Sequence, residues 1–435
     1  MNRIAQISAA LAGYDPNALN VEGVHAFLAR LATPAVSGQR EELPLFEALG
    51  RVLAEDLISP LSVPPHDNSA MDGFAFDGAL LEGAEGEVTL RVAGTALAGS
   101  PWHAPLARGD AVKIMTGAVM PEGLDTVVPQ EFCTIQGEQV SFPATALRRG
   151  DNRRLAGEDL MQGAAALRAG DRLTPAALGL LGSLGLGRVP VWRRLRVAFF
   201  STGNEILSVG QAPREGAVYD SNRYTIYGLL TRLGCEAIDF GPVPDDPDAL
   251  EAALRRAADE ADAVITSGGV SGGEADHTRA VMQRVGDMAF WRVAMRPGRP
   301  MAVGLIARTA SAYNGTAVLF GLPGNPVAVM VTFLAFVQPA LLRMMGCNPA
   351  ACAPPPLLRA RSLDTIRKKP GRTEYQRGWV ENAPGALPTV RIAGNQGSGV
   401  LSSMVRANGL VVLPHDQGNI PAGGEVNVMM FDGLI

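Results

Sequence analysis

The sequence contains few cysteines, no excess of charge of either sign and no long uninterrupted apolar run. Its 435 residues include only 4 cysteines, and none has a CxxC or zinc-like spacing, which argues against a disulfide framework or a zinc site. Buried thiols in a reducing cytoplasm are the simpler interpretation. The net charge of −5 argues against a nucleic-acid-binding protein, which would show a basic stripe or domain. A hydrophobic content of 47% excludes an acidic disordered chain.

Membrane insertion and export are also disfavoured. The longest apolar run, residues 327–337, is ended by Gln338 and Pro339, well short of the roughly 20 residues that span a bilayer. Residues 1–7 contain a single basic residue and no apolar core, so they do not resemble a signal peptide. We therefore expect a cytoplasmic protein that binds neither a membrane nor nucleic acid.

Several common catalytic signatures are missing as well. The chain has no HExxH, no GxxxxGK[ST] and no GxGxxG motif, and its 5 histidines are scattered. These absences argue against a zinc protease, a P-loop nucleotidase and a Rossmann dehydrogenase. Glycine and proline, in contrast, are abundant at 50 and 31 residues, about 19% of the chain against about 12% in average proteins. We expect many tight loops and sites lined by backbone.

The pattern of apolar runs, glycines and prolines changes along the chain and predicts three regions. Residues 1–191 begin with one amphipathic helix at about 20–31 and continue as short apolar runs between glycines and prolines, typical of β-rich modules. Strands and helices alternate in residues 192–350, which predicts parallel βαβ units and a doubly wound sheet. A Pro-rich linker then precedes regularly spaced short strands, so residues 354–435 are predicted to form a small β-barrel.

The predicted α/β region carries its polar residues at strand ends. In an open parallel sheet, ligands bind just beyond the carboxyl ends of the strands. Four loops follow predicted strands there, at residues 201–205, 245–246, 267–276 and 322–326. Their glycines allow backbone N–H groups to approach an anion. Their carboxylates suit Mg²⁺, which is held by one or two acidic groups plus substrate oxygens.

Each of these loops also has a purely structural interpretation. The glycine-rich turn at 267–273 is consistent with a tight strand-to-helix connection, and the acidic pair 245–246 with a helix N-cap. The prolines in 322–326 suit the end of a strand and the start of a helix, and Glu205 and Asp276 suit solvated loops. The convergence of all four loops on one sheet edge favours a ligand site.

The motifs themselves resemble a known family. The α/β region resembles the molybdopterin-binding domain of molybdenum-cofactor biosynthesis proteins through STGNE (201–205), YDSNR (219–223), SGGVS (267–271), EAD (274–276), RPGRP (296–300) and GLPGNP (321–326). Outside it, the segments that resemble the molybdopterin molybdenumtransferase family are DNSAMDGFA (67–75), KIMTGA (113–118), GED (157–159), RTEYQRG (372–378) and QGSGVLSS (396–403). The likeness covers nearly the whole chain.

This resemblance implies a transferase that inserts molybdate into adenylylated molybdopterin and releases AMP with the help of Mg²⁺. It also implies an elongated homodimer, with two subdomains in residues 1–191. The active cleft would form between the molybdopterin-binding domain of one subunit and the N-terminal region of the other. Other molybdenum-cofactor biosynthesis enzymes are further possible partners.

The resemblance implies roles for individual residues. The carboxylates expected to hold or organise Mg²⁺ are Glu205, Asp245 and Asp276. The arginines expected to face the anionic substrate are Arg292 and Arg296. The residues expected to shape the pterin-phosphate pocket are Ser267, Gly268, Gly269, Pro323 and Pro326. The residues expected to complete the site from the N-terminal region are Asp72, Thr116 and Asp159, and those expected at the cleft edge from the barrel are Arg377 and Ser398.

Two other functions remain compatible with the same α/β domain. One is an adenylyltransferase that makes adenylylated molybdopterin, although the long N-terminal region and the barrel argue against it. The other is a non-enzymatic scaffold of the same fold. The sequence also leaves open whether the natural oxyanion is molybdate or tungstate, because the two ions have nearly the same size and charge.

Overall fold

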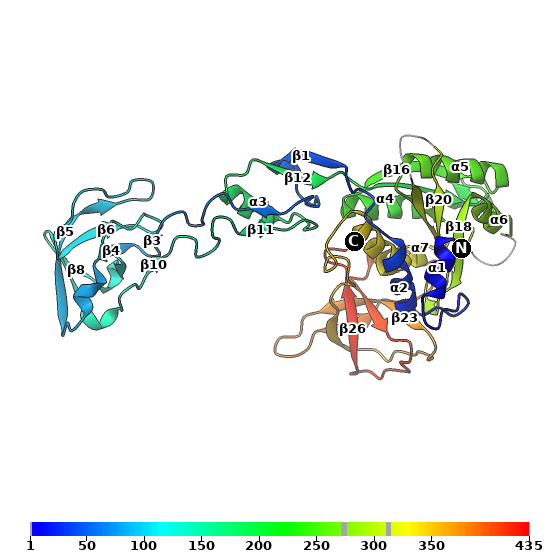
Figure 1. Cartoon of the computed structure of the whole chain (residues 1–435). Coiled ribbons are helices and arrows are strands. Elements are labelled where there is room, and N and C mark those ends of the chain that lie inside the picture. The colour runs from blue at the N-terminus through cyan, green and yellow to red at the C-terminus, as the bar shows by residue number, and fades with distance from the viewer. Residues whose placement is uncertain (1, 271–275, 310–314, 435) are drawn as a thin grey trace.

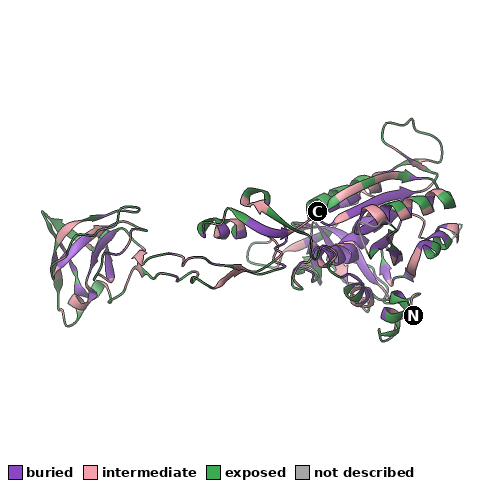
Figure 2. Cartoon of the chain, turned by 45° about the horizontal axis from the view of Figure 1, so that its top comes forward, coloured by how far each residue is buried: buried purple, intermediate pink, exposed green. Residues whose placement is uncertain are grey.

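The structure, a computed structural model, describes residues 2–270, 276–309 and 315–434. The molecule is elongated, with a β-rich distal module at one end and a larger body at the other (Figure 1). Two chain segments run between these ends by way of a smaller linking module, as the view coloured by burial also shows (Figure 2). The body contains an α/β sheet and a C-terminal barrel.

A six-stranded sheet with the order β16-β13-β17-β21-β20-β18 forms the centre of the body. The first four strands are parallel, whereas β20 is antiparallel to both of its neighbours. The predicted doubly wound α/β fold is therefore confirmed, with an antiparallel extension. The strand bounds are Glu236–Val243 (β16), Arg196–Thr202 (β13), Ala263–Ser267 (β17), Thr316–Leu322 (β21), Pro300–Ala307 (β20) and Gly286–Arg292 (β18).

The reversed direction of β20 departs from the parallel order that the alternating pattern predicts. A parallel connection needs a crossover of about a dozen or more residues, and β21 begins only nine positions after β20 ends at Ala307. The two strands therefore form an antiparallel pair. β18 pairs with the far side of β20, so β18 and β21 run in the same direction and end at the same edge.

Helices cover both faces of this sheet and bury separate cores. On β13, Phe200 faces the core under α5 and α6, while Phe199 faces the core under α4 and the long helix after β21. This alternation follows from the two-residue period of a strand. α4 begins after its N-cap Asp220 and ends at Gly234, whose left-handed φ of 94° favours glycine. The bounds are Ser221–Leu233 (α4), Pro247–Glu260 (α5) and Asp276–Val285 (α6).

The apolar run at 327–337 forms the middle of a long buried helix. The helix comprises α7 (Pro326–Thr332), the π-helical segment η5 (Phe333–Val337) and α8 (Gln338–Met344). Proline lacks an N–H donor, and the π segment immediately before Pro339 is the kind of local adjustment that accommodates such a residue. By length and composition this helix could span a membrane, but 83% of its apolar window is buried inside the protein, as expected of a core helix.

The N-terminal helices lie on the body although the chain then leaves it. α1 (Arg3–Ala9) precedes α2 (Val21–Leu31), which confirms the predicted helix at 20–31 and is capped by the Asn20 side chain. Val24, Phe27 and Leu28 of α2 are buried in the same core as the α/β sheet. The N-terminal helix α2 is therefore part of the body's core.

The linking and distal modules are built from short strands. The linking module pairs β1 (Arg40–Pro44) with β12 (Arg188–Trp192) and β2 (Leu57–Ile58) with β11 (Ala165–Leu167), beside η1 (Leu45–Glu47) and α3 (Pro175–Ser183). The distal sheet has the order β7-β4-β6-β5-β9-β8. Its bounds are Thr126–Pro129, Gly73–Phe76, Asp110–Ile114, Glu87–Ala96, Gln139–Pro143 and Thr134–Gln136, with turns η2 (Gly78–Leu81), η3 (Gln130–Phe132) and η4 (Ala144–Ala146).

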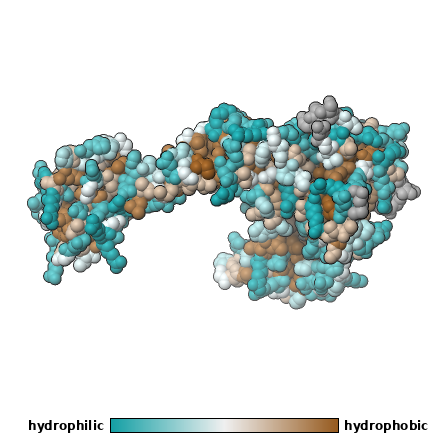
Figure 3. All heavy atoms as spheres, in the orientation of Figure 1, coloured by the Kyte–Doolittle hydropathy of each residue, from teal (hydrophilic) through white to brown (hydrophobic). Residues whose placement is uncertain are grey.

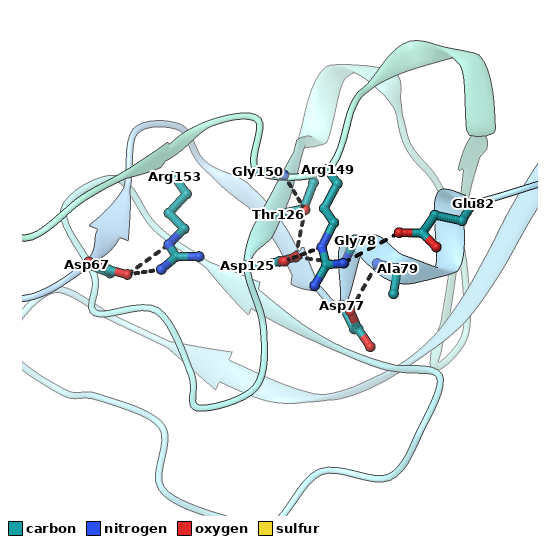
Figure 4. Close-up of polar contacts among 10 residues, drawn as sticks. All are labelled: Asp67, Asp77, Gly78, Ala79, Glu82, Asp125, Thr126, Arg149, Gly150 and Arg153. Carbon is teal, nitrogen blue, oxygen red and sulfur yellow. Dashed lines mark hydrogen bonds and ion pairs between the residues drawn. The ribbon is translucent and has the colours of Figure 1, made fainter.

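Polar contacts fasten the loops of the distal module (Figure 4). Asp125 accepts hydrogen bonds from the Gly78 N–H at 2.8 Å and from Arg149 Nε at 2.7 Å. Asp67 pairs with Arg153, beside the contact of β3 (Asn68–Ser69) with β10 (Arg153–Arg154). The Asp67–Arg153 pair joins the outgoing and returning chain segments where they enter the module.

A closed five-stranded barrel completes the body and confirms the barrel predicted for the C-terminal region. β23 pairs with both β24 and β25, which closes the order β23-β24-β22-β26-β25. The short strand β19 (Met295–Arg296) pairs with β23 and so ties the α/β domain to the barrel. The barrel bounds are Leu358–Ser362 (β22), Thr373–Glu381 (β23), Thr389–Ile392 (β24), Gly409–Leu413 (β25) and Glu425–Met430 (β26), with α9 at Ser402–Val405.

Candidate functional site

A cavity of about 610 Å³ opens at the carboxyl edge of the parallel strands, and we refer to it as the sheet-edge cavity. Its walls come from the ends of β13 and β17, from the pair β14 (Ile206–Leu207) and β15 (Val218–Tyr219), and from the starts of α4 and α7. Six of the residues predicted from the sequence line it: Glu205, Asp245, Ser267, Gly268, Gly269 and Pro326. All four predicted loops contribute to this group, and residues 271–275 of the loop 267–276 lie outside the described residues.

The two aspartates that follow β16, Asp245 and Asp246, have different roles. The Asp246 side chain accepts hydrogen bonds from the Asp248 and Ala249 N–H groups and caps α5. Asp245 is therefore not needed as a cap, and its Oδ1 lies 2.7 Å from His277 Nε2 in the wall of the cavity. The N-cap interpretation applies to the second aspartate, and the first remains available to a ligand.

Glu205 and Asp245 fit a hydrated Mg²⁺, which needs one or two carboxylates together with substrate oxygens. Both residues are exposed and line the same cavity. The third predicted carboxylate, Asp276, begins α6, but its side chain lies outside the described residues. Among the residues that are described, no group of three or more His, Cys, Asp or Glu side chains is arranged to hold a metal.

The glycine turn after β17 brings backbone close to the end of β13. Gly268 and Gly269 have φ values of 95° and 68°, in the left-handed region. A Cβ on Gly268 would lie 2.7 Å from the carbonyl oxygen of Thr202, and one on Gly269 would lie 2.8 Å from Cγ2 of Thr278. A side chain at either position would therefore clash, so the turn requires glycine, and its Gly268 N–H donates to the Leu322 carbonyl at 3.1 Å.

The loop after β21 joins the cavity to the barrel. Pro326 lines the cavity at the first turn of α7, whereas Pro323 is buried next to the end of β21. Asn325 Nδ2 donates to Ser398 Oγ at 3.0 Å, and the Val327 N–H donates to the Ser398 carbonyl at 3.1 Å. Ser398 therefore holds the barrel loop against the cavity rim, where the adjacent Gly399 is part of the lining.

Arg377 is placed differently from the cleft-edge position expected for it. The residue is 1% exposed, and its guanidinium donates to Ser403 Oγ and to the Asn395 and Gly397 carbonyls. Burial, with repulsion from the nearby Arg296, lowers the pKa of Arg377 to about 10. Arg377 therefore shapes the loop that carries Ser398 and does not itself line the sheet-edge cavity.

Arg292 lies at the same sheet edge but in a separate basic pocket. β18 ends at Arg292, two strands from the end of β21. A pocket of about 380 Å³ there includes the basic side chains of Arg292, Arg299, Lys369 and Arg372. Arg296 is exposed on β19 and lines neither this pocket nor the sheet-edge cavity.

The remaining predicted residues lie beside β3, β4 and β6 of the distal module or between β10 and β11, and Figure 1 shows these elements away from the α/β sheet. Asp72 and Thr116 form a pair on the distal module, where the Thr116 N–H and hydroxyl each donate to Asp72 Oδ1 at 2.7 Å. These hydrogen bonds hold the pKa of Asp72 below its usual value. Asp159 is exposed on the returning segment, and its N–H donates to the Val63 carbonyl.

Another buried acidic centre occupies the opposite edge of the sheet. Asp262 lies at the start of β17 and accepts hydrogen bonds from Arg193, Arg308 and the Arg196 N–H. Burial alone would raise the pKa of Asp262, but these donors hold the pKa below its usual value. This position, away from the carboxyl ends of the strands, indicates a structural role.

We expect Asp262→Asn to lower the free energy of unfolding by about 3–5 kcal/mol at pH 7, because it leaves buried arginines without their partner. A depressed folded-state pKa stabilises the protein above the unfolded value of about 3.9 and loses that effect as the pH falls through the folded value. The difference from wild type, measured by urea unfolding between pH 7 and 3, should therefore shrink below about pH 4. Asp248→Asn, on an exposed face of α5, is the control. A pH-independent difference would contradict this assignment.

The sequence analysis missed several residues of the cavity wall. Asp220, Asn222, His277 and Thr278 face or adjoin it. Asp220 and Asn222 fall within the YDSNR motif, at a strand-to-helix turn. The position of that turn beside the other loops would have identified them.

The four cysteines take no part in the site. All four are free, and Cys235 and Cys347 are buried in the body. Burial raises the pKa of each of these two thiols to about 12, so they remain protonated at neutral pH and are poor nucleophiles.

The fold and the cavity define a class: a multidomain α/β protein whose ligand site lies at the carboxyl edge of an open sheet. Three family regions match the chain, described as "MoeA N-terminal region (domain I and II)" at residues 19–185, "Probable molybdopterin binding domain" at 198–343 and "MoeA C-terminal region (domain IV)" at 359–431. The chain belongs to the molybdopterin molybdenumtransferase family. The family resemblance of the sequence motifs is thereby confirmed.

Individual relatives match over most of the chain. The molybdopterin molybdenumtransferase of Haemophilus influenzae is 41% identical over 398 residues, covering 91% of this chain and 95% of that protein. The enzyme of the same name from Nostoc is 36% identical over 392 residues, covering 89% and 88%. A crystal structure of the molybdopterin biosynthesis moeA protein from Pyrococcus horikoshii superposes with a TM-score of 0.77 at 27% identity, covering 95% of this chain and 100% of that one.

Proposed function

We propose that this protein inserts molybdenum from molybdate into adenylylated molybdopterin and releases AMP. The observation that carries the proposal is the sheet-edge cavity, which combines two carboxylates with a turn that only glycine can form. A polyanionic substrate needs both backbone donors and a cation that offsets carboxylate repulsion. The transferase names of the full-length relatives support the same reaction class.

Mg²⁺ is the cation that the donor set favours. Glu205 and Asp245 would hold it from two neighbouring loops, and Asp276 would add a third carboxylate from the start of α6. When bound, Mg²⁺ would polarise the phosphate oxygens and neutralise charge that develops on the AMP leaving group. His277, 2.7 Å from Asp245 Oδ1, would orient that carboxylate toward the ion.

The anionic groups of the two substrates would bind along the sheet edge. The Gly268–Gly269 turn, with Ser267, Pro323 and Pro326, would shape the pocket for the pterin phosphate. Arg292 and Arg296 would supply positive charge on the side of the oxyanion. Arg377 and Ser398 would act as positioning residues, because both hold the barrel loop at the rim.

A homodimer would complete the site. Asp72, Thr116 and Asp159 lie too far along the molecule to reach the cavity of their own chain (Figure 1), so they would serve the cavity of a second copy. Exposed apolar residues support such an association: Tyr224 and Tyr227 on α4 and Val405 on α9 line an apolar groove, and hydrophobic residues also reach the surface of the linking module (Figure 3). We propose a cytoplasmic location, with other molybdenum-cofactor biosynthesis enzymes as further partners.

The test is to incubate the purified protein with adenylylated molybdopterin and Mg²⁺, with and without molybdate. We expect AMP release that depends on molybdate and stops when Mg²⁺ is chelated. ATP consumption with free molybdopterin would instead identify an adenylyltransferase, and the absence of both reactions would favour a scaffold. Tungstate in place of molybdate would measure the oxyanion preference.

A further inference from the structure

One wall of the sheet-edge cavity contains a carboxylate that lacks a hydrogen-bond donor. Asp220 lines the cavity and is 3% exposed. Its Oδ1 accepts hydrogen bonds from Ser201 Oγ at 2.9 Å and from the Arg223 N–H at 3.0 Å. Its Oδ2 is buried and has no partner within residues 2–270, 276–309 and 315–434. Because a buried acceptor without a donor is costly, this oxygen indicates a ligand that supplies one.

The hydroxyls beside Asp220 are oriented by its carboxylate. Ser201 Oγ lies 2.9 Å from both Asp220 Oδ1 and Ser267 Oγ. A hydroxyl has a single hydrogen, and an ionised carboxylate can only accept. Ser201 therefore donates to Asp220, and Ser267 must donate to Ser201. As a result, Ser267 presents lone pairs, and not a donor, to the cavity.

Two further buried polar side chains extend this wall. Asn222 Nδ2 donates to the Gly324 carbonyl at 2.7 Å, which fixes the amide and leaves its buried Oδ1 without a partner in the described part of the chain. Thr278 Oγ1 is likewise buried and unpaired among the described residues. Asn222 and Thr278 are 8% and 1% exposed, and both line the cavity. Asp220 Oδ2 and Asn222 Oδ1 therefore offer acceptors that suit N–H donors, whereas the Thr278 hydroxyl can either accept or donate.

We propose that Asp220 and Asn222 bind the N–H edge of the substrate's pterin ring, formed by its 2-amino group and N3–H. This inference rests on the proposed function, since it assigns the two ends of that substrate to the two sides of one cavity. The pterin edge has two adjacent donors, and the two buried acceptors without a partner among the described residues are Asp220 Oδ2 and Asn222 Oδ1. The phosphate end then lies at the Gly268–Gly269 turn, where no side chain intrudes.

The test compares two ring ligands that differ at the 2-position, 6-hydroxymethylpterin and its 2-oxo analogue 6-hydroxymethyllumazine, by fluorescence titration. A site built to pair with a donor rejects a ligand that lacks it, so wild type should bind the pterin at least about tenfold more tightly. Asp220→Asn should weaken pterin binding at least about tenfold and remove the preference. Asparagine caps helices as well as aspartate does, so α4 should be retained, which circular dichroism checks.

Asp239→Asn is the matched control. Asp239 lies on β16, pairs with Arg223 of α4 and does not line the cavity. This variant should leave both affinities unchanged within about twofold. Equal binding of the two ligands by wild type, or unchanged pterin binding by Asp220→Asn, would overturn the inference. The inference would also be overturned if Asp220→Asn lost Mg²⁺ binding but kept pterin binding, because Asp220 would then be a cation ligand. A pterin preference in a protein that never inserts molybdenum would refute the proposed function but not this assignment.

Discussion

Replacing Glu205 by glutamine should reduce molybdate-dependent AMP release by at least about 100-fold, because the substitution removes a charged Mg²⁺ ligand while keeping the shape of the side chain. The remaining activity should require a higher Mg²⁺ concentration. Glu205 is exposed at the cavity, so the thermal unfolding temperature should stay close to that of wild type. The measurement is a Mg²⁺ titration of the initial rate for both proteins.

Glu215→Gln provides a matched control for this prediction. Glu215 is also exposed and lies in the β14–β15 connection, which begins shortly after Glu205, but it does not line the cavity. Its activity and its Mg²⁺ dependence should equal those of wild type. If Glu205→Gln retained the wild-type rate and the wild-type Mg²⁺ dependence, the metal assignment at this edge would be wrong.

Two inactive variants should restore activity when they share one dimer. Consider a mixed dimer of one Asp72→Asn chain and one Glu205→Gln chain. The cavity of the Asp72→Asn chain keeps its own Glu205 and is completed by Asp72 of the other chain. The cavity of the Glu205→Gln chain lacks both residues. Co-expression with two different affinity tags and sequential purification would isolate this species. It should show about half of the wild-type activity per dimer, because a twofold symmetric dimer carries two sites. Each parent variant alone should be nearly inactive.

The reciprocal dimer distinguishes a shared site from a site within one chain. A wild-type chain paired with an Asp72→Asn/Glu205→Gln double variant has no intact shared cavity, so it should be inactive. If the site were built within one chain, this dimer would retain half of the activity and the first mixed dimer would have none. Light scattering of the wild type checks the oligomeric state, and a fully active monomer would contradict the shared site.

Much of the fold could be predicted from local patterns. Apolar spacing predicted the helix at 20–31, and the regularly spaced short strands predicted the C-terminal barrel, and both are observed. The direction of β20 and the presence of β18 were not predicted. Strand direction depends on how distant segments pair, and a short apolar run has the same appearance in parallel and antiparallel strands.

The candidate site was predicted in outline, and its details required the structure. The sequence placed Glu205, Asp245 and the glycine turn on one sheet edge, and these residues do line one cavity. The cap interpretation of the pair 245–246 did not say which aspartate is the cap, since only the first turn of α5 decides that. The sequence also could not show that the Arg377 guanidinium is bound to main-chain carbonyls, because those partners come from another strand connection.

The sequence by itself determined the family and the chemical character of the strand-end loops, because motif order and strand ends are local properties of the chain. Only the tertiary structure decided which polar atoms lack partners, as at Asp220 Oδ2, and which predicted residues are separated from the cavity, as at Asp72. The physical reason is that hydrogen-bond satisfaction and distance depend on contacts between remote segments, which no local pattern encodes.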